Sequence, residues 1–225
     1  MEDLSHAKRG GLERDSVVAT ALDLLDEVGL DGLTVRRLAT ELGVKSPALY
    51  WHFRDKQELL DLMSQRLQAE QGMAGPRDGE PWPEWIARRA HERRSLLLSR
   101  RDGARLVSGT SPGPAAARMF DAELGVLTGF GFTPVQAMRA VIAIGHYITG
   151  FVLEEQAAQE RRDRAESGAD ERRGRRGREE EAAPRERLPV LEAAIREGGP
   201  PEGSEAFEQG LRMLIDGMQA LTQAS

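Results

Sequence analysis

The stretch between Thr34 and Lys56 gathers residue types that can contact nucleic acid. It has five basic residues against two acidic ones, a local balance of +3 in a chain of 225 residues whose net charge is −6. Arginine can bind the edge of guanine through two hydrogen bonds, and lysine attracts phosphates regardless of base sequence. This patch predicts contact with double-stranded DNA, although the whole chain is acidic.

Two short helices separated by a tight turn are expected to position this patch. Thr34 can cap the first helix, and Gly43 ends it. Ser46 followed by Pro47 predicts the start of the second, with serine at the N-cap and proline at the first helical position, where an N–H would have no helical partner. That helix is expected to hold residues 48–52. The pair predicts a helix-turn-helix, whose second helix can enter the major groove.

The second helix presents two pairs of large side chains. Leu49 and Phe53 lie four residues apart and provide an inward face, so we expect Tyr50 and Trp51 to face outward. The alternative is that Tyr50 and Trp51 are core aromatic residues. The two interpretations predict different solvent exposure for the rings of Tyr50 and Trp51.

The rest of the chain has the apolar periodicity of helices, and no strand pattern or internal repeat competes with an all-α fold. We expect domains at 1–70 and 71–225, separated by a Gly/Pro-rich boundary. Helices are expected around residues 17–28, which Gly29 ends, 55–67, where Asp55 and Glu58 resemble a capping box, 85–97, 119–127, 134–155, 189–197 and 205–221. The last of these is expected to have a broad apolar face that nothing else in the chain covers.

Residues 160–187 differ from the rest of the chain. They contain ten arginines and nine acidic residues, with no apolar side chain larger than alanine and one proline. Such a segment cannot bury enough area to offset its loss of conformational entropy, which predicts a disordered insert. Its arginine cluster at 172–178 could touch nucleic acid, but Glu179–Glu181 neutralise it, so a solvated loop is favoured.

Several classes of protein are disfavoured. The absence of cysteine excludes disulfides, thiolate zinc sites and cysteine nucleophiles. We find no phosphate-binding, dinucleotide-binding or hydrolase motif, and His146 and Glu154 would stand about 12 Å apart on one helix, too far to share a metal ion. We therefore expect no enzyme, no cofactor and no metal. A small-molecule-binding enzyme and a non-specific DNA-architectural protein remain the alternatives; the acidic net charge disfavours the second.

Membrane insertion and secretion are not expected. The longest apolar stretch, residues 140–153, is interrupted by His146 and two glycines and is too short to cross a bilayer. Residues 1–11 carry charge instead of an apolar signal sequence. These features predict a cytoplasmic protein with no membrane partner.

A continuous series of motifs resembles the DNA-binding domain of the TetR family of transcriptional regulators: Ala21–Leu30, Gly32–Ala39, Leu42–Val44, Leu49–Phe53, Lys56 and Leu59–Asp61. Motifs in the second half resemble the tetracycline-repressor-like branch of that family: Arg101–Ala104, Gly109–Thr110, Pro112, Gly131–Phe132, Gly145–Tyr147 and Val152–Glu154. The resemblance implies a repressor that a small molecule releases from DNA. It implies DNA-contacting roles for Arg36, Lys45, Ser46, Pro47, Ala48, Tyr50, Trp51, His52 and Lys56.

The resemblance also implies a homodimer on a palindromic operator, because one recognition helix makes too few base contacts for genomic specificity. Residues 134–155 and 205–221 would form a four-helix bundle with their counterparts in the partner. The alternative is that these helices only fill the core of a monomer.

By the same resemblance, an effector cavity would be lined by Arg89, Arg93, Val107, Thr110, Pro112, Phe120, Glu123, Met138, Val141, Ile142 and His146. Val107 stands where tetracycline repressors have a histidine that ligates the drug's magnesium ion. We therefore expect an aromatic or largely apolar, antibiotic-like inducer bound without metal and oriented partly by His146. The two arginines favour an anionic or polyphenolic ligand if they face the cavity; alternatively, they are solvent-facing charges of an amphipathic helix.

Overall fold

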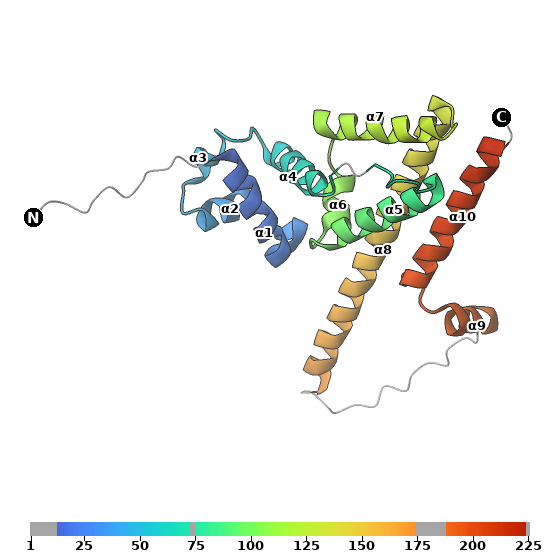
Figure 1. The fold of residues 1–225 in the computed structure, drawn as a ribbon. Coiled ribbons are helices and arrows are strands. Elements are labelled where there is room, and N and C mark those ends of the chain that lie inside the picture. The colour runs from blue at the N-terminus through green and yellow to red at the C-terminus, as the bar shows by residue number, and fades with distance from the viewer. Residues whose placement is uncertain (1–12, 73–74, 174–187, 224–225) are drawn as a thin grey trace, which may run out of the picture.

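The computed structural model describes residues 13–72, 75–173 and 188–223, and all regular secondary structure in these ranges is helical. The all-α prediction is therefore confirmed. Figure 1 shows a smaller group of helices at one end and a larger group around α8. The helices are α1 (Arg14–Gly32), α2 (Val35–Glu41), α3 (Ser46–Leu49), α4 (Lys56–Glu70), α5 (Trp82–Leu98), α6 (Gly103–Ser108), α7 (Pro114–Gly129), α8 (Pro134–Arg173), α9 (Pro189–Gly198) and α10 (Ser204–Gln223).

Local hydrogen bonds fix the ends of the N-terminal helices as the sequence predicts. The Thr34 hydroxyl accepts from the backbone N–H of Arg37 at 3.1 Å, and the Asp55 carboxylate accepts from that of Glu58 at 2.9 Å. The Glu58 carboxylate returns to the N–H of Arg54, one residue before the N-cap. Gly29 has a φ of 70° and interrupts the helical geometry of α1, where the apolar pattern ends.

The start and length of α3 differ from the prediction. Lys45 is the N-cap, Ser46 is the first helical residue and makes no side-chain cap, and the helix ends at Leu49 instead of continuing through residues 50–52. The shift arises because Lys45 is extended and its carbonyl already accepts from the N–H of Ala48 at 2.9 Å. Residues 50–52 form a turn, so the predicted recognition helix is a single turn of helix followed by a tight loop.

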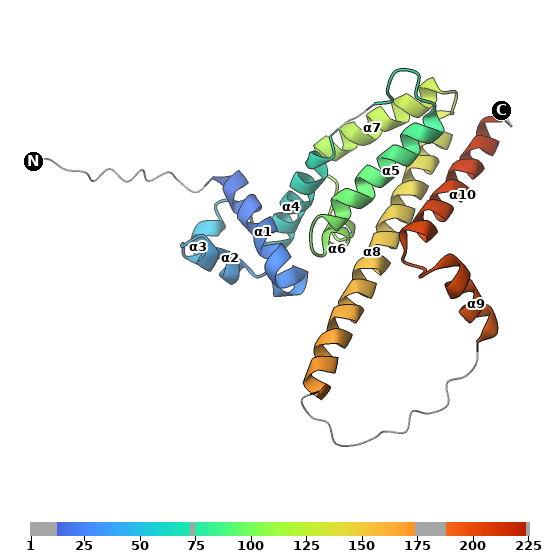
Figure 2. The ribbon, with the colours of Figure 1, turned by 60° about the horizontal axis from the view of Figure 1, so that its bottom comes forward.

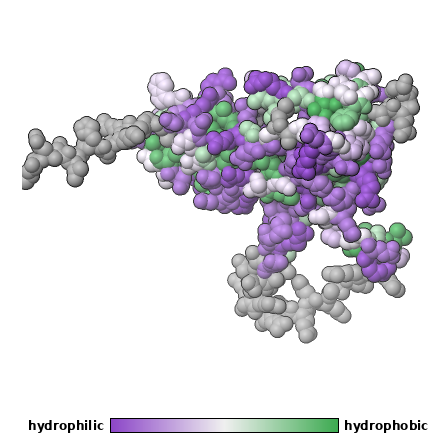
Figure 3. All heavy atoms as spheres, in the orientation of Figure 1, coloured by the Kyte–Doolittle hydropathy of each residue, from purple (hydrophilic) through white to green (hydrophobic). Residues whose placement is uncertain are grey.

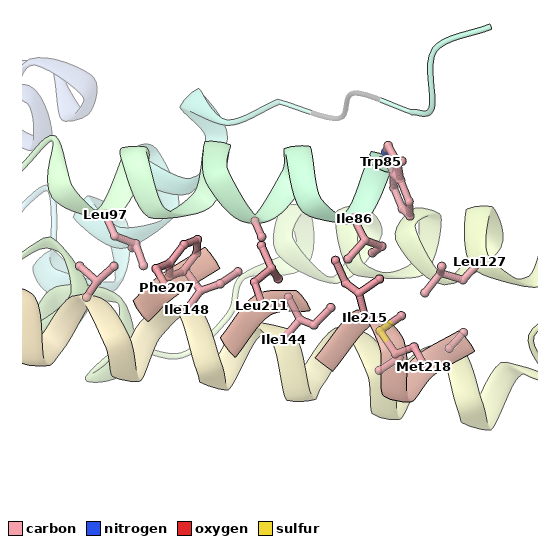
Figure 4. Packing of buried hydrophobic residues seen from close by; sticks show 14 of the residues in the cluster. Trp85, Ile86, Leu97, Leu127, Ile144, Ile148, Phe207, Leu211, Ile215 and Met218 are labelled. Carbon is pink, nitrogen blue, oxygen red and sulfur yellow. The ribbon is translucent and has the colours of Figure 1, made fainter. Parts of the chain in front are cut away.

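Two apolar clusters hold the chain together. One lies between α1 and α4 and includes Leu49 and Phe53, with Leu106 of α6. The other joins α5, α7, α8 and α10 around Trp85 and Phe207, both almost fully buried. Figure 4 shows side chains of α10 pointing between α5 and α8. The short helix α6 contributes to both clusters and therefore lies at the junction.

The expected uncovered face of α10 is contradicted by the structure. Phe207, Leu211, Ile215 and Met218 are buried in the second cluster, because α5 and α8 of the same chain cover them. Among the large apolar side chains described on α10, Met213 is exposed, at 68%. The helix thus fills the core of its own chain and leaves a narrower apolar edge outside.

The disordered insert predicted for residues 160–187 is wrong over its first half, where α8 continues to Arg173. Side chains one turn apart support the extension: Arg164 pairs with Glu160, and Gln159 donates to Asp163. Such pairs, added to an established helix, replace the missing apolar burial. Figures 1 and 2 show this part of α8 extending beyond the other helices. Residues 174–187, including most of the arginine cluster and Glu179–Glu181, lie outside the described residues.

The length argument against a membrane span also fails, because α8 is continuous. Within the described ranges, its stretch 134–166 is one helix that is long and apolar enough to cross a bilayer by length and composition, and 28% of the apolar window is buried. Val135, Met138 and Ile142 are its large exposed apolar residues. A second exposed apolar surface covers α9, none of whose residues is buried (Figure 3).

Candidate DNA-binding face and ligand cavity

The α3 region presents its aromatic side chains to solvent. Leu49 and Phe53 are buried, as their spacing predicts, whereas Tyr50 is 54% and Trp51 is 87% exposed. The alternative in which Tyr50 and Trp51 belong to the core is therefore excluded. A tryptophan this exposed on a small, well-packed unit is a candidate for contact with another molecule.

The other predicted DNA contacts lie around Trp51 on α2, α3 and the start of α4. Arg36, Lys45, Pro47 and Lys56 are exposed, and Ser46, Ala48 and His52 are partly exposed. Among the described residues, no carboxylate forms a salt bridge with any of the three basic side chains of this set. By contrast, the nearby Arg54 is held by Glu58 at 3.0 Å. The contacts with bases and phosphates stay a prediction.

The carboxylate of Asp102 joins α1 to the loop before α6. Asp102 is 5% exposed and has a φ of 57°, a left-handed conformation that aspartate tolerates better than most residues. Its carboxylate accepts from the N–H of Leu30 at 2.7 Å and from the Arg105 guanidinium at 3.0 Å. The N–H of Leu30 follows the break at Gly29 and would otherwise lack a helical partner.

Further polar contacts surround this junction. Arg100 binds Asp26 at 2.6 Å, and Arg105 binds Asp31 at 3.0 Å. The contact with Arg105 lowers the pKa of the Asp31 carboxyl.

On the other side of the junction, two side chains of α4 bind the backbone that follows α6. Gln57 donates to the carbonyl of Gly109, and Asp61 accepts from the N–H of Ser111. Sequence reasoning missed these residues, because partners 50 or more positions apart leave no local pattern.

A cavity of about 610 Å³ opens between α4, α5, α7 and α8. Most of its wall is apolar. It includes eight of the residues that the sequence assigned to a ligand site: Arg89, Arg93, Pro112, Phe120, Glu123, Val141, Ile142 and His146. Ligand contact by these eight stays a prediction, but the fold brings them together around one space.

Three residues assigned to the same site do not line it. Val107 packs against both apolar clusters, and its carbonyl accepts from the hydroxyl of Thr110 at 3.1 Å. Met138 is exposed on α8. In place of these residues, Gln65 and Gln68 of α4 and its C-cap Gln71, spaced three residues apart, line the cavity, and α5 contributes Trp85. The spacing of the glutamines predicts that they share one helical face, but it does not show whether that face lines a cavity or is exposed to solvent.

Both arginines line the cavity; Arg89 is buried, which excludes a solvent-facing charge there, and Arg93 is partly buried. Arg89 is 8% exposed; its terminal nitrogens reach Glu123, Glu92 and the carbonyl of Gly72, and its buried Nε has no hydrogen-bond partner. Both terminal nitrogens of Arg93 donate to the amide oxygen of Gln68 at 3.2 Å. Burial lowers the pKa of Arg93, with Glu123 opposing and Arg89 reinforcing the shift.

The described residues include no cluster of three or more histidine, cysteine, aspartate or glutamate side chains placed to hold a metal ion. The cavity wall itself has one carboxylate, Glu123, and one imidazole, His146. Because Mg²⁺ prefers several oxygen ligands, this wall offers it little. The arrangement instead suits an organic ligand held by apolar contact and a few polar groups.

Comparison with known proteins gives matches over both groups of helices. Residues 17–63 match the profile of the bacterial regulatory proteins of the tetR family, and residues 75–222 match the tetracyclin repressor-like C-terminal domain. The tetracycline repressor class A of transposon 1721 from Escherichia coli is 42% identical over 211 residues, which cover 92% of this chain and 90% of the relative.

Solved structures give the same result. A possible TetR family transcriptional regulator from Streptomyces coelicolor A3(2) superposes with a TM-score of 0.76 at 36% identity, covering 93% of this chain and all of the other. TetR class A in complex with 5a,6-anhydrotetracycline and magnesium superposes with a TM-score of 0.66 at 38% identity, covering 93% and 99% of the two chains. The likeness therefore extends over both groups of helices.

Proposed function

Because the chain belongs to the TetR family, with a tetracyclin repressor-like C-terminal domain, we propose that it is a homodimeric repressor whose palindromic operator is released when an inducer fills the cavity. The chain is a ligand-responsive DNA-binding transcriptional repressor. Its relatives are repressors, which supports a non-enzymatic role in the cytoplasm, where the operator DNA lies.

A single helix carries this proposal, since α4 reaches both sites. Its first residue, Lys56, belongs to the exposed basic face, and its Gln65 and Gln68, with the C-cap Gln71, line the cavity a few turns later. A ligand that changes the position of α4 would therefore move the DNA-binding face of each protomer. In a two-fold dimer the two faces must meet successive major grooves about 34 Å apart, so a small rotation lowers operator affinity.

We assign residues 1–70 to DNA binding and residues 71–225 to effector binding and dimerisation. The two apolar clusters support this division: the buried residues of one come from 17–67 with Leu106 added, and those of the other from 85–218. The exposed apolar residues of α8 and Met213 of α10 support a bundle with a second copy, because burial in an interface would remove their apolar area from water.

The proposed inducer is an antibiotic-like molecule that is aromatic or largely apolar and binds without metal. Trp85, Ile86 and Phe120 provide apolar contact, and His146 on α8 can orient a polar substituent. Although related structures hold tetracyclines, Val107 lies outside the lining and cannot ligate magnesium.

Selection of bound sequences from random duplex DNA tests the proposal. We expect enrichment of a two-fold site, and mobility shifts with that site should show a complex of two protomers. Screening aromatic compounds against the complex should then find molecules that release the DNA. Enrichment of no two-fold site would refute the operator; binding that depends only on DNA length would favour an architectural protein.

A further inference from the structure

The guanidinium of Arg93 has an unusual environment for a charge inside a protein. It lines the cavity, and its terminal nitrogens donate to one neutral oxygen, that of Gln68. None of the salt bridges among the described residues includes Arg93. Arg93 is partly buried, and Glu123 acts on it only at a distance, so its charge lacks the direct carboxylate partner that buried charges normally have.

One helical turn earlier, Arg89 brings a second charge to the same wall. Its Nε is buried and has no hydrogen-bond partner, although Glu123 and Glu92 engage its terminal nitrogens. Glu92 is more exposed, pairs also with Arg88 and does not line the cavity. An unused, buried donor from a guanidinium is rare enough in native proteins to indicate a missing acceptor.

The charges of the lining are unequal. Two arginines face one carboxylate, that of Glu123, while the remaining lining residues are neutral or, in the case of His146, able to accept as well as donate. A ligand that is apolar throughout would fill the volume but leave the charge of Arg93 without a direct partner, since Glu123 and Glu92 pair with Arg89. A ligand with one negative group would compensate it and supply acceptors to Arg93.

We infer that the cavity recognises an anionic aromatic ligand, whose carboxylate or comparably acidic group is bound by Arg93, with Arg89 beside it. This inference deepens the proposed function by naming the chemical class of the inducer. The apolar wall around Trp85 and Phe120 would hold the ring system. Arginine suits the role because its planar fork binds a carboxylate through two hydrogen bonds.

Calorimetric titration with anthraquinone-2-carboxylate and with its neutral carboxamide tests the inference. The two probes share one ring system and differ in charge. We expect the acid to bind the wild-type protein about tenfold or more tightly than the amide, the size expected of a charge-assisted hydrogen bond. Arg93→Met should bring this ratio close to one by weakening only the acid.

A second variant keeps the arginine in place. Gln68→Glu supplies a carboxylate at the position of the amide that Arg93 already contacts, so it should weaken the acid and leave the amide unchanged. Arg118→Met is the matched control, because Arg118 is exposed on α7 next to two lining residues but does not line the cavity. It removes the same charge and should leave the ratio unchanged.

Failure of the acid to bind, equal affinities of the two probes, or an unchanged preference in both Arg93→Met and Gln68→Glu would overturn the inference. Operator binding by the ligand-free protein is measured separately. A protein that binds its operator but ignores the charge of the probe contradicts the inference alone, whereas a protein without a two-fold site contradicts the proposed function.

Discussion

At the scale of single residues, the basic side chains around Trp51 are expected to make two kinds of DNA contact, one with base edges and one with phosphates. Arg36 lies on α2 and Lys56 at the start of α4, and both are exposed. Arginine at a base edge discriminates between sequences, whereas lysine at a phosphate does not. Truncating the two side chains should therefore have different effects on DNA binding: one on sequence preference and the other on overall affinity.

Lys56→Ala is expected to weaken binding to all DNA sequences alike and to lower the salt dependence of binding by roughly one phosphate contact. Arg36→Ala is expected to relax preference at one base pair per half-site, at a cost of about 1–3 kcal/mol on the preferred base. Titrations of matched and mismatched operators at two salt concentrations measure both. A uniform loss in Arg36→Ala would place this arginine on the phosphates.

Asp102 shows how one side chain can connect two groups of helices. Asp102→Ala removes the acceptor of the Leu30 N–H and leaves a side chain that tolerates the left-handed backbone less well. Together these effects should lower the free energy of unfolding by about 2–4 kcal/mol. Chemical denaturation at a fixed protein concentration measures the loss.

Asp102→Asn is the control, since its amide oxygen can still accept from Leu30 and asparagine tolerates the left-handed region. It should lose less than half as much stability, reflecting only the weaker contact with Arg105. Equal losses in both variants would assign the stability to the ion pair instead of the backbone hydrogen bond.

At the scale of helices, the exposed part of α10 offers a clean test of the dimer. Leu214 packs partly against the apolar core of its own chain, so its substitution would disturb folding and assembly together. Met213 is the better position because it is exposed in the single chain. Met213→Glu should bury an unpaired charge in a two-fold bundle and convert the protein to monomers with weak operator binding.

Sedimentation of Met213→Glu beside Val190→Glu checks this expectation. Val190 lies on α9, is even more exposed at 83%, and is outside the proposed bundle of α8 and α10. The α9 variant should therefore remain a dimer. A dimeric Met213→Glu protein with full operator affinity would show that α10 does not build the interface.

At the scale of the whole molecule, release of the operator should not require a metal ion. The cavity wall carries one carboxylate, and Val107 replaces the metal-ligating histidine expected from the resemblance. EDTA should therefore leave inducer-driven release unchanged in a mobility-shift assay. Tight tetracycline binding that depends on added magnesium would contradict this prediction.

The helices and the inward face of the DNA-binding unit could be predicted from the sequence, because caps and apolar spacing act between neighbours. Thr34, Asp55 and the pair Leu49 and Phe53 all act within one helical turn. The extension of α8 could not, since side-chain pairs there replace apolar burial. The packing of α5 and α8 against the apolar face of α10 could not be predicted either, because these helices are distant in the sequence.

The cavity was predictable in outline only. The resemblance predicted eight residues that line the cavity in the structure. It did not predict Gln68, which accepts from Arg93 and comes from a different helix 25 positions away. No local pattern indicates that pair. Likewise, the position of Met138 outside the lining depends on the rotation of α8 against its neighbours.

The three tryptophans of the chain are natural fluorescent reporters for the two sites. Trp51, almost fully solvated on the proposed DNA-binding face, should emit at long wavelength and be quenched by iodide unless DNA covers it. Trp85, buried at the cavity wall, should emit at shorter wavelength, resist iodide and transfer energy to an absorbing aromatic ligand. Trp82 packs edge-on against Phe132 and gives a background in both measurements. Unlabelled protein should thus report operator occupancy and inducer occupancy in different parts of one emission spectrum.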